Sequence, residues 1–196
     1  MSTSIRTAGP GDVGPVADLV ATAFAGLRAT AWLVPDSAVR VDVLRADFRI
    51  LVEHAVEHGD VDVVEDGAGA AVWFPRADPL PEPPDYERRL AEACGPWTQR
   101  FTHLDELFAK NHPESPHHHL ALLAVRPDHQ DRGLGSALLR HRHALLDAAG
   151  TPAYLEASSP RSRALYLRHG YRDRPPFDLP DGTRFWPMWR RPGEGG

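Results

Sequence analysis

Length, composition and charge already exclude several classes of protein. The 196 residues are 42% hydrophobic and 25% charged, which is ordinary for a globular protein, and the length suits one domain over the whole chain, 1–196. The formal net charge of −5 argues against a nucleic-acid-binding surface and is compatible with a cationic amine as substrate. The single cysteine, Cys94, excludes an internal disulfide and a thiolate-cluster metal site. The first residues lack the features of a signal peptide, and no apolar run approaches the roughly 20 residues of a membrane span, so we expect a cytoplasmic protein.

The first third of the chain predicts a strand and two helices. Residues 4–7 form a candidate first strand, which the following Gly-Pro-Gly stops. Asp12 is a suitable N-cap for a helix whose apolar residues recur at helical spacing up to Phe24. A loop is expected over residues 26–36. Ser37 is then expected to cap a second helix with one apolar side.

The middle of the chain predicts a hairpin, a loop and two further helices. Residues 61–65 and 69–74 are short apolar runs joined by Asp-Gly, which is a strong hairpin signal. The stretch 77–85 is rich in proline and acid, as is typical of a surface loop. Helices are expected over 86–93 and 99–109, separated by Gly-Pro.

The most informative stretch is a strand, a glycine loop and a helix in direct succession. The apolar strand 118–125 stops at Arg-Pro, a polar loop leads to Gly133-Leu134-Gly135, and an amphipathic helix follows from Ser136. Glycines let an anion approach the backbone, and a helix N-terminus presents unpaired N–H groups and partial positive charge. We therefore expect a cradle for the pyrophosphate of a cofactor; the alternative is an ordinary tight turn.

The last quarter of the chain completes the sheet. Strand 153–157 is expected to lie parallel to the preceding strand, with the glycine-loop helix as the crossover. A helix is expected between Pro160 and Gly170, followed by a pair of strands, 171–177 and 183–189, around Pro-Asp-Gly. The order of elements predicts an α/β fold in which a central mixed sheet of about six to seven strands is flanked by helices on both faces.

Residues 130–135, Gln-Asp-Arg-Gly-Leu-Gly, discriminate between the known phosphate-binding loops. No lysine follows Gly135 as a P-loop requires, and Leu138 stands where a dinucleotide fingerprint has its third glycine. The hexapeptide instead resembles the Q/R-x-x-G-x-G/A signature of the GNAT superfamily of N-acetyltransferases, between the strand and helix where that family has it. The run from Leu165 to Tyr171 is similar to the family's Y-x-x-x-G-F element.

The resemblance implies the GNAT fold and acetyl-CoA as cosubstrate. It implies that main-chain N–H groups of the glycine loop hold the pyrophosphate and that the central strand pairs with the pantetheine arm. The cofactor-binding residues implied in this way are Leu123, Ala124, Val125, Gln130, Asp131, Arg132, Gly133, Leu134, Gly135, Ser136 and Ser159. Ser159 departs from the asparagine that many members carry there. The arginines of the late helix are expected either to face solvent or to contact the CoA 3′-phosphate.

Two side chains are candidates for the catalytic chemistry. By resemblance, Tyr166 is the general acid for the departing CoA sulfur; the alternative is a tyrosine packed between helix and sheet. Glu156 is the first candidate for the base that deprotonates the amine, and a structural hydrogen bond is the alternative. His117 and His119, which alternation places on one face of a strand, are second candidates. No third ligand accompanies this pair, so no metal site is expected.

The acceptor is expected to be a primary amine of a small molecule, attacked directly in a ternary complex. Within the superfamily, the Pro-Asp-His-Gln loop and the Leu-Glu strand followed by Ser-Ser-Pro-Arg resemble the puromycin N-acetyltransferases, which implies an aminonucleoside or another antibiotic-like amine and a role in antibiotic resistance. Two alternatives stay open: a protein or peptide N-acetyltransferase, with an open groove in place of a pocket capped by 26–36 and 77–85, and a non-catalytic acyl-CoA-binding module. No nucleic acid or membrane is expected as a partner, and either a monomer or a homodimer fits.

Overall fold

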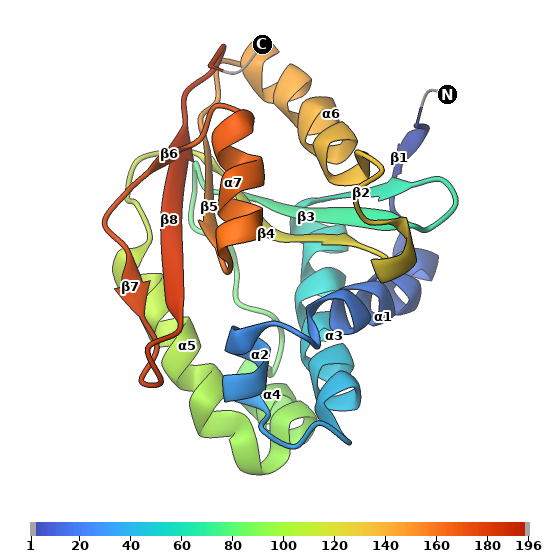
Figure 1. The fold of residues 1–196 in the computed structure, drawn as a ribbon, viewed down its shortest axis with the longest axis vertical. Coiled ribbons are helices and arrows are strands. Elements are labelled where there is room, and N and C mark those ends of the chain that lie inside the picture. The colour runs from blue at the N-terminus through green and yellow to red at the C-terminus, as the bar shows by residue number, and fades with distance from the viewer. Residues whose placement is uncertain (1–2, 195–196) are drawn as a thin grey trace.

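A twisted mixed sheet forms the centre of the molecule (Figure 1), and the computed structural model describes residues 3–194. Its strands are β1 (Ile5–Thr7), β2 (Asp60–Val64), β3 (Gly69–Pro75), β4 (His118–Val125), β5 (Ala153–Ala157), β6 (Arg172–Asp173), β7 (Phe177–Asp178) and β8 (Arg184–Arg190). They lie in the order β1-β2-β3-β4-β5-β8-β6, and β7 pairs with β8 off this path. β4 and β5 are parallel and the other pairs are antiparallel. The predicted α/β class with a mixed sheet is confirmed.

The described residues form eight strands, against the six to seven expected from the sequence. The predicted strand 171–177 is divided into β6 and β7 because Pro175 and Pro176 have no N–H to donate to a strand ladder. The two predicted hairpins, β2–β3 and β7–β8, are both present. The extra strand therefore reflects an interruption within one predicted strand and leaves the topology unchanged.

Helices connect the strands and cover both faces of the sheet. They are α1 (Val13–Phe24), α2 (Arg28–Leu33), α3 (Arg40–His58), α4 (Tyr86–Cys94), α5 (Thr98–Asn111), α6 (Leu134–Ala148) and α7 (Pro160–Arg168). Short 3₁₀ turns occupy 10–12, 95–97 and 127–129. Among residues 3–194, no helix combines the length and the hydropathy needed to cross a membrane.

The expected loop over 26–36 is wrong, because it contains α2. The Thr30 hydroxyl donates to the carbonyl oxygens of Phe24 and Leu27, at 2.6 and 3.0 Å, and so ties this short helix to the end of α1. Ala29, Thr30 and Leu33 are buried on its inner side. Six residues without glycine or proline suffice for one turn and a half of helix when such packing stabilises them.

Two predicted helix caps are also wrong. Ser37 does not cap the second long helix, since α3 begins three residues later at Arg40. Asp12 directly precedes α1, but its carboxylate accepts a hydrogen bond from the Gly9 N–H at 2.8 Å and pairs with Arg6. It therefore stabilises the preceding 3₁₀ turn, whereas a true N-cap would accept from the first turn of its own helix.

The two faces of the sheet are covered by different helices (Figure 1). α1 and α3 bury apolar side chains such as Val20 and Val52 against Val72 and neighbouring residues of β2 to β4. α6 and α7 pack on the opposite face, where Leu138 and Leu155 belong to a second apolar cluster. The glycine-loop helix, α6, thus packs against one face of the sheet.

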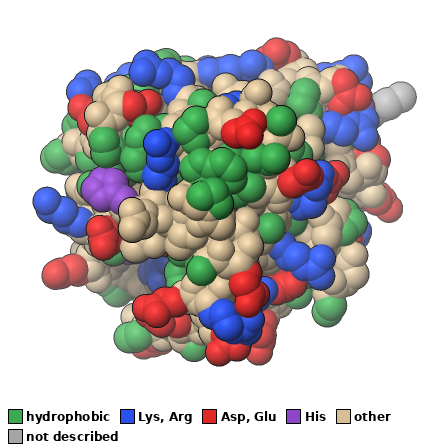
Figure 2. Space-filling model, turned by 90° about the horizontal axis from the view of Figure 1, so that it is seen from below, with side chains coloured by type: hydrophobic (Ala, Val, Ile, Leu, Met, Phe, Trp, Pro, Cys, Tyr) green, Lys and Arg blue, Asp and Glu red, His purple; other side chains and the backbone are tan. Residues whose placement is uncertain are grey.

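A third apolar cluster lies where α2, α4 and α5 meet the start of α3 and the β7–β8 hairpin. Its buried members include Leu33, Leu44, Phe101 and Phe185. This end of the molecule is lowest in Figure 1, and Figure 2, which views it from below, shows hydrophobic side chains at the centre with charged ones scattered around them. α2, α3, α4 and α5 together form the floor of the molecule beneath the sheet.

The parallel pairing of β4 with β5 is short. It ends at the pair Leu120–Leu155, although both strands continue beyond it. At this point β4 has a bulge, in which Ala121 is an extra residue between the partners of Val72 and Trp73. Because a bulge bends its strand, β4 turns away from β5. Figure 1 shows the result: β4 runs across the view while β5 runs down it.

A buried ion pair fixes α6 on the sheet. Arg142 in α6 donates two hydrogen bonds to Asp62 in β2, from Nε to Oδ2 at 2.9 Å and from Nη2 to Oδ1 at 2.6 Å. Asp62 is fully buried and Arg142 nearly so, and a further contact joins Arg142 to Asp60 at 3.0 Å. A paired charge in the interior holds its position firmly, because separation would leave an uncompensated buried ion. The pair therefore helps to determine where the N-terminus of α6 lies.

We predict that Arg142→Ala destabilises the fold by about 3–5 kcal/mol, since the change leaves Asp62 buried without its partner. The measurement is the free energy of unfolding in urea. Arg140→Ala on the exposed side of the same helix is the matched control and should change it by less than about 0.5 kcal/mol. Equal effects of the two substitutions would contradict the structural role given to the pair.

Candidate active site

One long cavity of about 1090 Å³ occupies the space between the separated strands. It begins at the glycine loop, follows the second half of β4, passes the end of β5 and α7, and ends on the floor made by α2, α3, α4 and α5. Its two ends differ in chemistry. The upper end is lined largely by loop and strand backbone, while the lower end is lined by aromatic and acidic side chains.

The glycine loop has the backbone conformation of an anion cradle. Asp131 and Gly133 both have positive φ, 62° and 80°, and they alternate with residues of ordinary conformation before α6 begins at Leu134. Such alternation turns successive N–H groups toward one point, and the first turn of the helix adds N–H groups without carbonyl partners. A Cβ at Gly135 would lie 3.5 Å from the Leu165 side chain, which is ordinary van der Waals contact, so the packing of α6 on α7 does not itself require glycine there. The loop geometry therefore fits a diphosphate.

Ten of the eleven predicted cofactor-binding residues line the cavity. They are Leu123, Ala124, Val125, Gln130, Asp131, Gly133, Leu134, Gly135, Ser136 and Ser159. Arg132 is the exception, as the lining does not include it. Gln130 donates from Nε2 to the carbonyl oxygen of Val125 at 3.3 Å and so joins the loop to the end of β4.

Ser159 has a structural role that the sequence did not indicate. Its hydroxyl oxygen accepts a hydrogen bond from the Ser162 N–H at 3.1 Å and closes a capping box at the start of α7. Ser159 thereby fixes the helix that carries Tyr166. The asparagine expected at this position by resemblance is thus replaced by a residue whose hydroxyl is already engaged in capping.

The edge of β4 that faces the cavity carries unpaired backbone groups. The Arg126 N–H donates to Ala68 next to β3, so alternation directs the N–H groups of Leu123 and Val125 to the other edge, where β5 has already turned away. Before the bulge, in contrast, the His118 N–H donates toward β5, to Pro152. The extra residue therefore shifts which backbone groups the second half of β4 offers on its open edge.

Tyr166 in α7 lies in the cavity wall behind this edge. Its side chain is buried, and no hydrogen bond of its hydroxyl to another residue within 3–194 is present. Burial raises the pKa of Tyr166 well above its ordinary value, so the phenol keeps its proton at neutral pH. A protonated, unpaired hydroxyl on a cavity wall is available to donate a proton or a hydrogen bond to a bound molecule.

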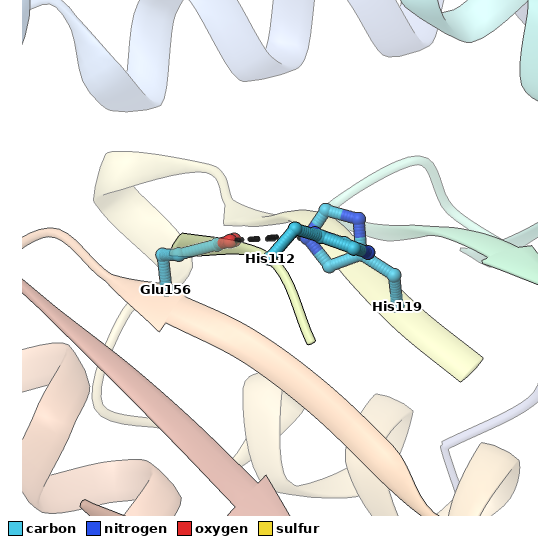
Figure 3. A group of neighbouring side chains, drawn as sticks. All are labelled: His112, His119 and Glu156. Atoms are coloured by element: carbon cyan, nitrogen blue, oxygen red, sulfur yellow. Dashed lines mark hydrogen bonds and ion pairs between the residues drawn. The ribbon is translucent and has the colours of Figure 1, made fainter. Parts of the chain in front are cut away.

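Glu156 lies at the middle of the cavity and is surrounded by histidines (Figure 3). Its Oε2 accepts a hydrogen bond from His119 Nε2 at 2.9 Å, while Oε1 is buried without a partner. Only 5% of the Glu156 side chain is exposed. Burial alone would raise the pKa of Glu156, but His119, with smaller contributions from Tyr154 and His112, outweighs burial and holds this pKa below its ordinary value. The carboxylate is therefore ionised and has one free oxygen.

His112, which follows α5, completes this group although the sequence did not single it out. Its Nδ1 lies 3.9 Å from the free Oε1 of Glu156, and its Nε2 lies 3.1 Å from Nε2 of His117. Burial lowers the pKa of His112 to about 3 and that of His117 to about 4, so both rings are neutral. His112 and His119 approach Glu156 from two different elements (Figure 3). A histidine in a loop after a helix gave no periodic or motif signal.

The hydrogen bonds determine the tautomer of each neutral histidine. His117 Nδ1 lies 2.7 Å from the carbonyl oxygen of Ser115, which can only accept, so the proton of His117 is on Nδ1. Its Nε2 must then accept from Nε2–H of His112. The Nδ1 of His112 is consequently a lone pair, directed at an unpartnered carboxylate oxygen. Two acceptors 3.9 Å apart leave a place for a donor such as water or an ammonium group between them.

The histidine expectations are thus partly changed. His117 and His119 do lie on one face of the strand, with ring centroids 6.4 Å apart. Only His119 contacts Glu156, whereas His117 orients His112. The pair His117 and His119 gains no third ligand, but a different group of three is present: ligating atoms of His112, His119 and Glu156 all lie within 4.8 Å of one another. The same spacing could accept a divalent cation, which the experiments below distinguish.

Some arginines of the late helix and its exit form ion pairs away from the cavity, and others line the cavity. Arg163 and Arg172 pair with Asp173 and Glu194 away from the cavity. Arg161 lines the cavity and donates to Asp131 at 2.8 Å, which compensates the negative charge of that side chain beside the anion cradle. Arg168 lines the cavity as well, so Arg161 and Arg168 are the late-helix arginines that could meet a phosphate.

Comparisons with known proteins bear on the fold. A family model described as an acetyltransferase (GNAT) domain matches residues 101–173. A histone acetyltransferase and related acetyltransferase from Corynebacterium glutamicum is 29% identical, with 98% of each chain covered and a TM-score of 0.75. Two structures that share the fold at lower identity are arylalkylamine N-acetyltransferase 2 of Aedes aegypti (14%, TM-score 0.62, 97% and 99% covered) and an Escherichia coli N-acetyltransferase for a ribosomal-protein alanine (18%, TM-score 0.57, 99% and 96% covered).

We predict that His112 and His117 stay neutral from pH 8 to pH 5, because burial places their pKa values near 3 and 4. Long-range ¹H–¹⁵N spectra should show His117 with its proton on Nδ1 and His112 with its proton on Nε2. His117→Phe removes the acceptor for His112 and should release the fixed tautomer of His112 while the fold persists. Protonation of either ring above pH 5.5 would contradict the assignment.

Proposed function

We propose that this chain, which has the fold of the GNAT acetyltransferases, moves an acetyl group from acetyl-CoA to a primary amine of a small molecule within a ternary complex. The observation that carries the proposal is the single cavity in which an anion cradle, an open strand edge, a protonated tyrosine and an ionised glutamate follow one another. These are the parts that acyl transfer to an amine needs: a held donor, a stabilised oxyanion, an acid and a base.

Acetyl-CoA fits the upper end of the cavity. The N–H groups from Asp131 to Ser136 would hold the pyrophosphate, with Arg161 close to the phosphates. The pantetheine amides would continue the sheet along the open edge of β4, where Leu123 and Val125 offer backbone groups. This direction leads the thioester from the glycine loop toward Tyr166 and Glu156.

The acceptor would reach the thioester from the lower end. Its ammonium gives a proton to the acceptor pair formed by Glu156 Oε1 and His112 Nδ1, directly or through water. The neutral nitrogen then attacks the thioester carbonyl carbon, and an N–H of the open β4 edge stabilises the oxyanion. When the carbon–sulfur bond breaks, the thiolate takes the proton of Tyr166. The attacking nitrogen gives up its second proton, which returns to the Tyr166 phenolate directly or through water, leaving the neutral amide and free CoA.

The segments that border the lower end of the cavity favour a small acceptor over a protein chain. Leu27 and Leu33 from the 26–36 segment and Pro83 from the 77–85 loop border the cavity, as a capped pocket requires. An aminonucleoside such as puromycin is one acceptor of the expected kind, and modification of such an antibiotic in the cytoplasm would confer resistance. The alternative of a non-catalytic module is addressed by the next experiment.

We predict that Tyr166→Phe lowers kcat by about 10²-fold or more, because the thiolate loses its proton donor. Calorimetry should show acetyl-CoA binding within about twofold of the unchanged protein, since the cradle is main chain. Tyr171→Phe is the control: this tyrosine bonds to His143 outside the cavity, so the substitution should affect stability and spare turnover. Binding without turnover of any amine by the unchanged protein would favour the module, and no binding at all would refute the proposal.

We predict that Glu156→Gln lowers kcat/KM by about 10²-fold or more near neutral pH, because the ionised oxygen that accepts the proton is removed. The rise of the rate with pH should persist in the variant, because the pKa of Glu156 lies below its ordinary value and the amine is the group that titrates between pH 6 and 9. His112→Ala should give a smaller loss in the same direction. Rates are followed by release of free thiol between pH 6 and 9. A chelator should leave the rate of the unchanged protein unaltered; loss on chelation, restored by a divalent cation, would assign His112, His119 and Glu156 to a metal instead.

A further inference from the structure

The lower end of the cavity contains a carboxylate with no evident structural purpose. Asp47 in α3 lines the cavity and, within residues 3–194, forms no hydrogen bond and no ion pair. Asp105 in α5 lines the same end and accepts a hydrogen bond from Tyr86 at 2.7 Å, again with no cation beside it. Two carboxylates therefore line one end of the cavity, and neither has a cation paired with it among the described residues; Asp47 is half-buried and Asp105 is exposed.

The surroundings make this arrangement costly. Phe48, Leu104 and Phe108 border the same end of the cavity, so little polar surface replaces the water that Asp47 would have in solution. Burial, with a contribution from Asp105, raises the pKa of Asp47 to about 7. The other ionisable groups near the two carboxylates, Tyr86 and Cys94 of α4, are themselves neutral at that pH, since burial raises the pKa of both well above the usual range. The half-buried Asp47 carboxylate is therefore left available to a ligand in the cavity.

The positive charge elsewhere in the cavity does not compensate the floor. Arg76 lines the cavity nearer its middle, and the carboxylate that acts on the pKa of Arg76 is Glu156. Arg161 lies at the opposite end and pairs with Asp131. The middle of the cavity thus contains one cation and one anion, whereas the floor contains two carboxylates.

We propose that Asp47 and Asp105 bind a second cationic group of the acceptor, so that the acceptor is a diamine or an amine with a separate cationic group on an apolar body. This rests on the proposed function, because the first nitrogen would lie at Glu156 and His112. An acceptor that is uncharged beyond its reacting amine would leave Asp47 unpaired, and an anionic one would be repelled. A cation restores the charge balance of this end of the cavity, and the phenylalanines around it suit the apolar part between the two nitrogens.

The test compares acceptors that differ in one charge. Thiol release from acetyl-CoA is measured with hexylamine and 1,6-diaminohexane, with their homologues of four to eight carbons, and with 4-methylbenzylamine and 1,4-bis(aminomethyl)benzene. We expect the best diamine to exceed its matched monoamine by about tenfold or more in kcat/KM, mainly through KM, as a charge-assisted contact implies. Asp47→Asn should remove this preference and leave the monoamine within about twofold.

Two variants keep the test specific. Asp78→Asn, at an exposed position in the 77–85 loop, carries the same substitution and should change neither acceptor class. Asp105→Asn should reduce the preference for the diamine as well, and it serves if Asp47→Asn does not fold. In the absence of an acceptor, Asp47→Asn should raise the melting temperature at pH 8, because ionisation of Asp47 in the fold is unfavourable above its pKa of about 7.

The outcomes separate this inference from the proposed function. Turnover of monoamines without preference for any diamine overturns the inference and leaves acetyl transfer intact. An equal loss of kcat/KM for monoamines and diamines in Asp47→Asn has the same consequence. Calorimetric binding of 1,6-diaminohexane that requires Asp47, without turnover of any amine, supports the inference and overturns the proposed function. If the protein neither binds the diamines nor acetylates any amine, both are refuted.

Discussion

The separation of β4 from β5 is the constraint on which the rest of the structure depends. One extra residue, Ala121, bends β4 after its last pairing with β5 and leaves a strand edge in the interior with unpaired backbone groups. An open edge inside a protein is unfavourable unless a ligand or water completes it. The cavity, its direction and the place of the glycine loop at its upper end all follow from this single interruption of the sheet.

Positioning of the catalytic groups depends on the charges buried around that opening. Arg142 holds α6 against β2, and Arg190 of β8 pairs with Asp147 near the end of the same helix, with both contacts at 2.7 Å. Each of these ions has a partner close enough to compensate desolvation. Glu156 keeps one free oxygen and Asp47 has no partner. The fully paired charges of Arg142 and Arg190 stabilise the scaffold, whereas the incompletely paired carboxylates of Glu156 and Asp47 line the cavity. This difference indicates which charged groups serve function.

Local patterns predicted the half of the chain that builds the donor site. The strand 118–125, the glycine loop and the strand 153–157 are found where they were expected, since alternation and turn residues act over a few positions. The bulge at Ala121 was not predictable, because one additional apolar residue in an apolar strand leaves the pattern unchanged. His112 and Asp47 were missed for another reason. Their surroundings come from elements far away in the chain, which no local pattern records.

This difference follows from which groups recognise each substrate. A diphosphate and a pantetheine arm are bound mainly through main-chain N–H and carbonyl groups, so the sequence must supply glycines and a helix start at fixed spacing. An acceptor amine is recognised by side chains that α2, α3, α4 and α5 bring together from four separate segments. The motif that binds the donor is short and can be recognised in the sequence. The set of side chains that would bind the acceptor comes together only in the folded protein. Under the proposed function, specificity for the acceptor resides in the floor of the cavity, where substitutions would alter it without disturbing the donor site.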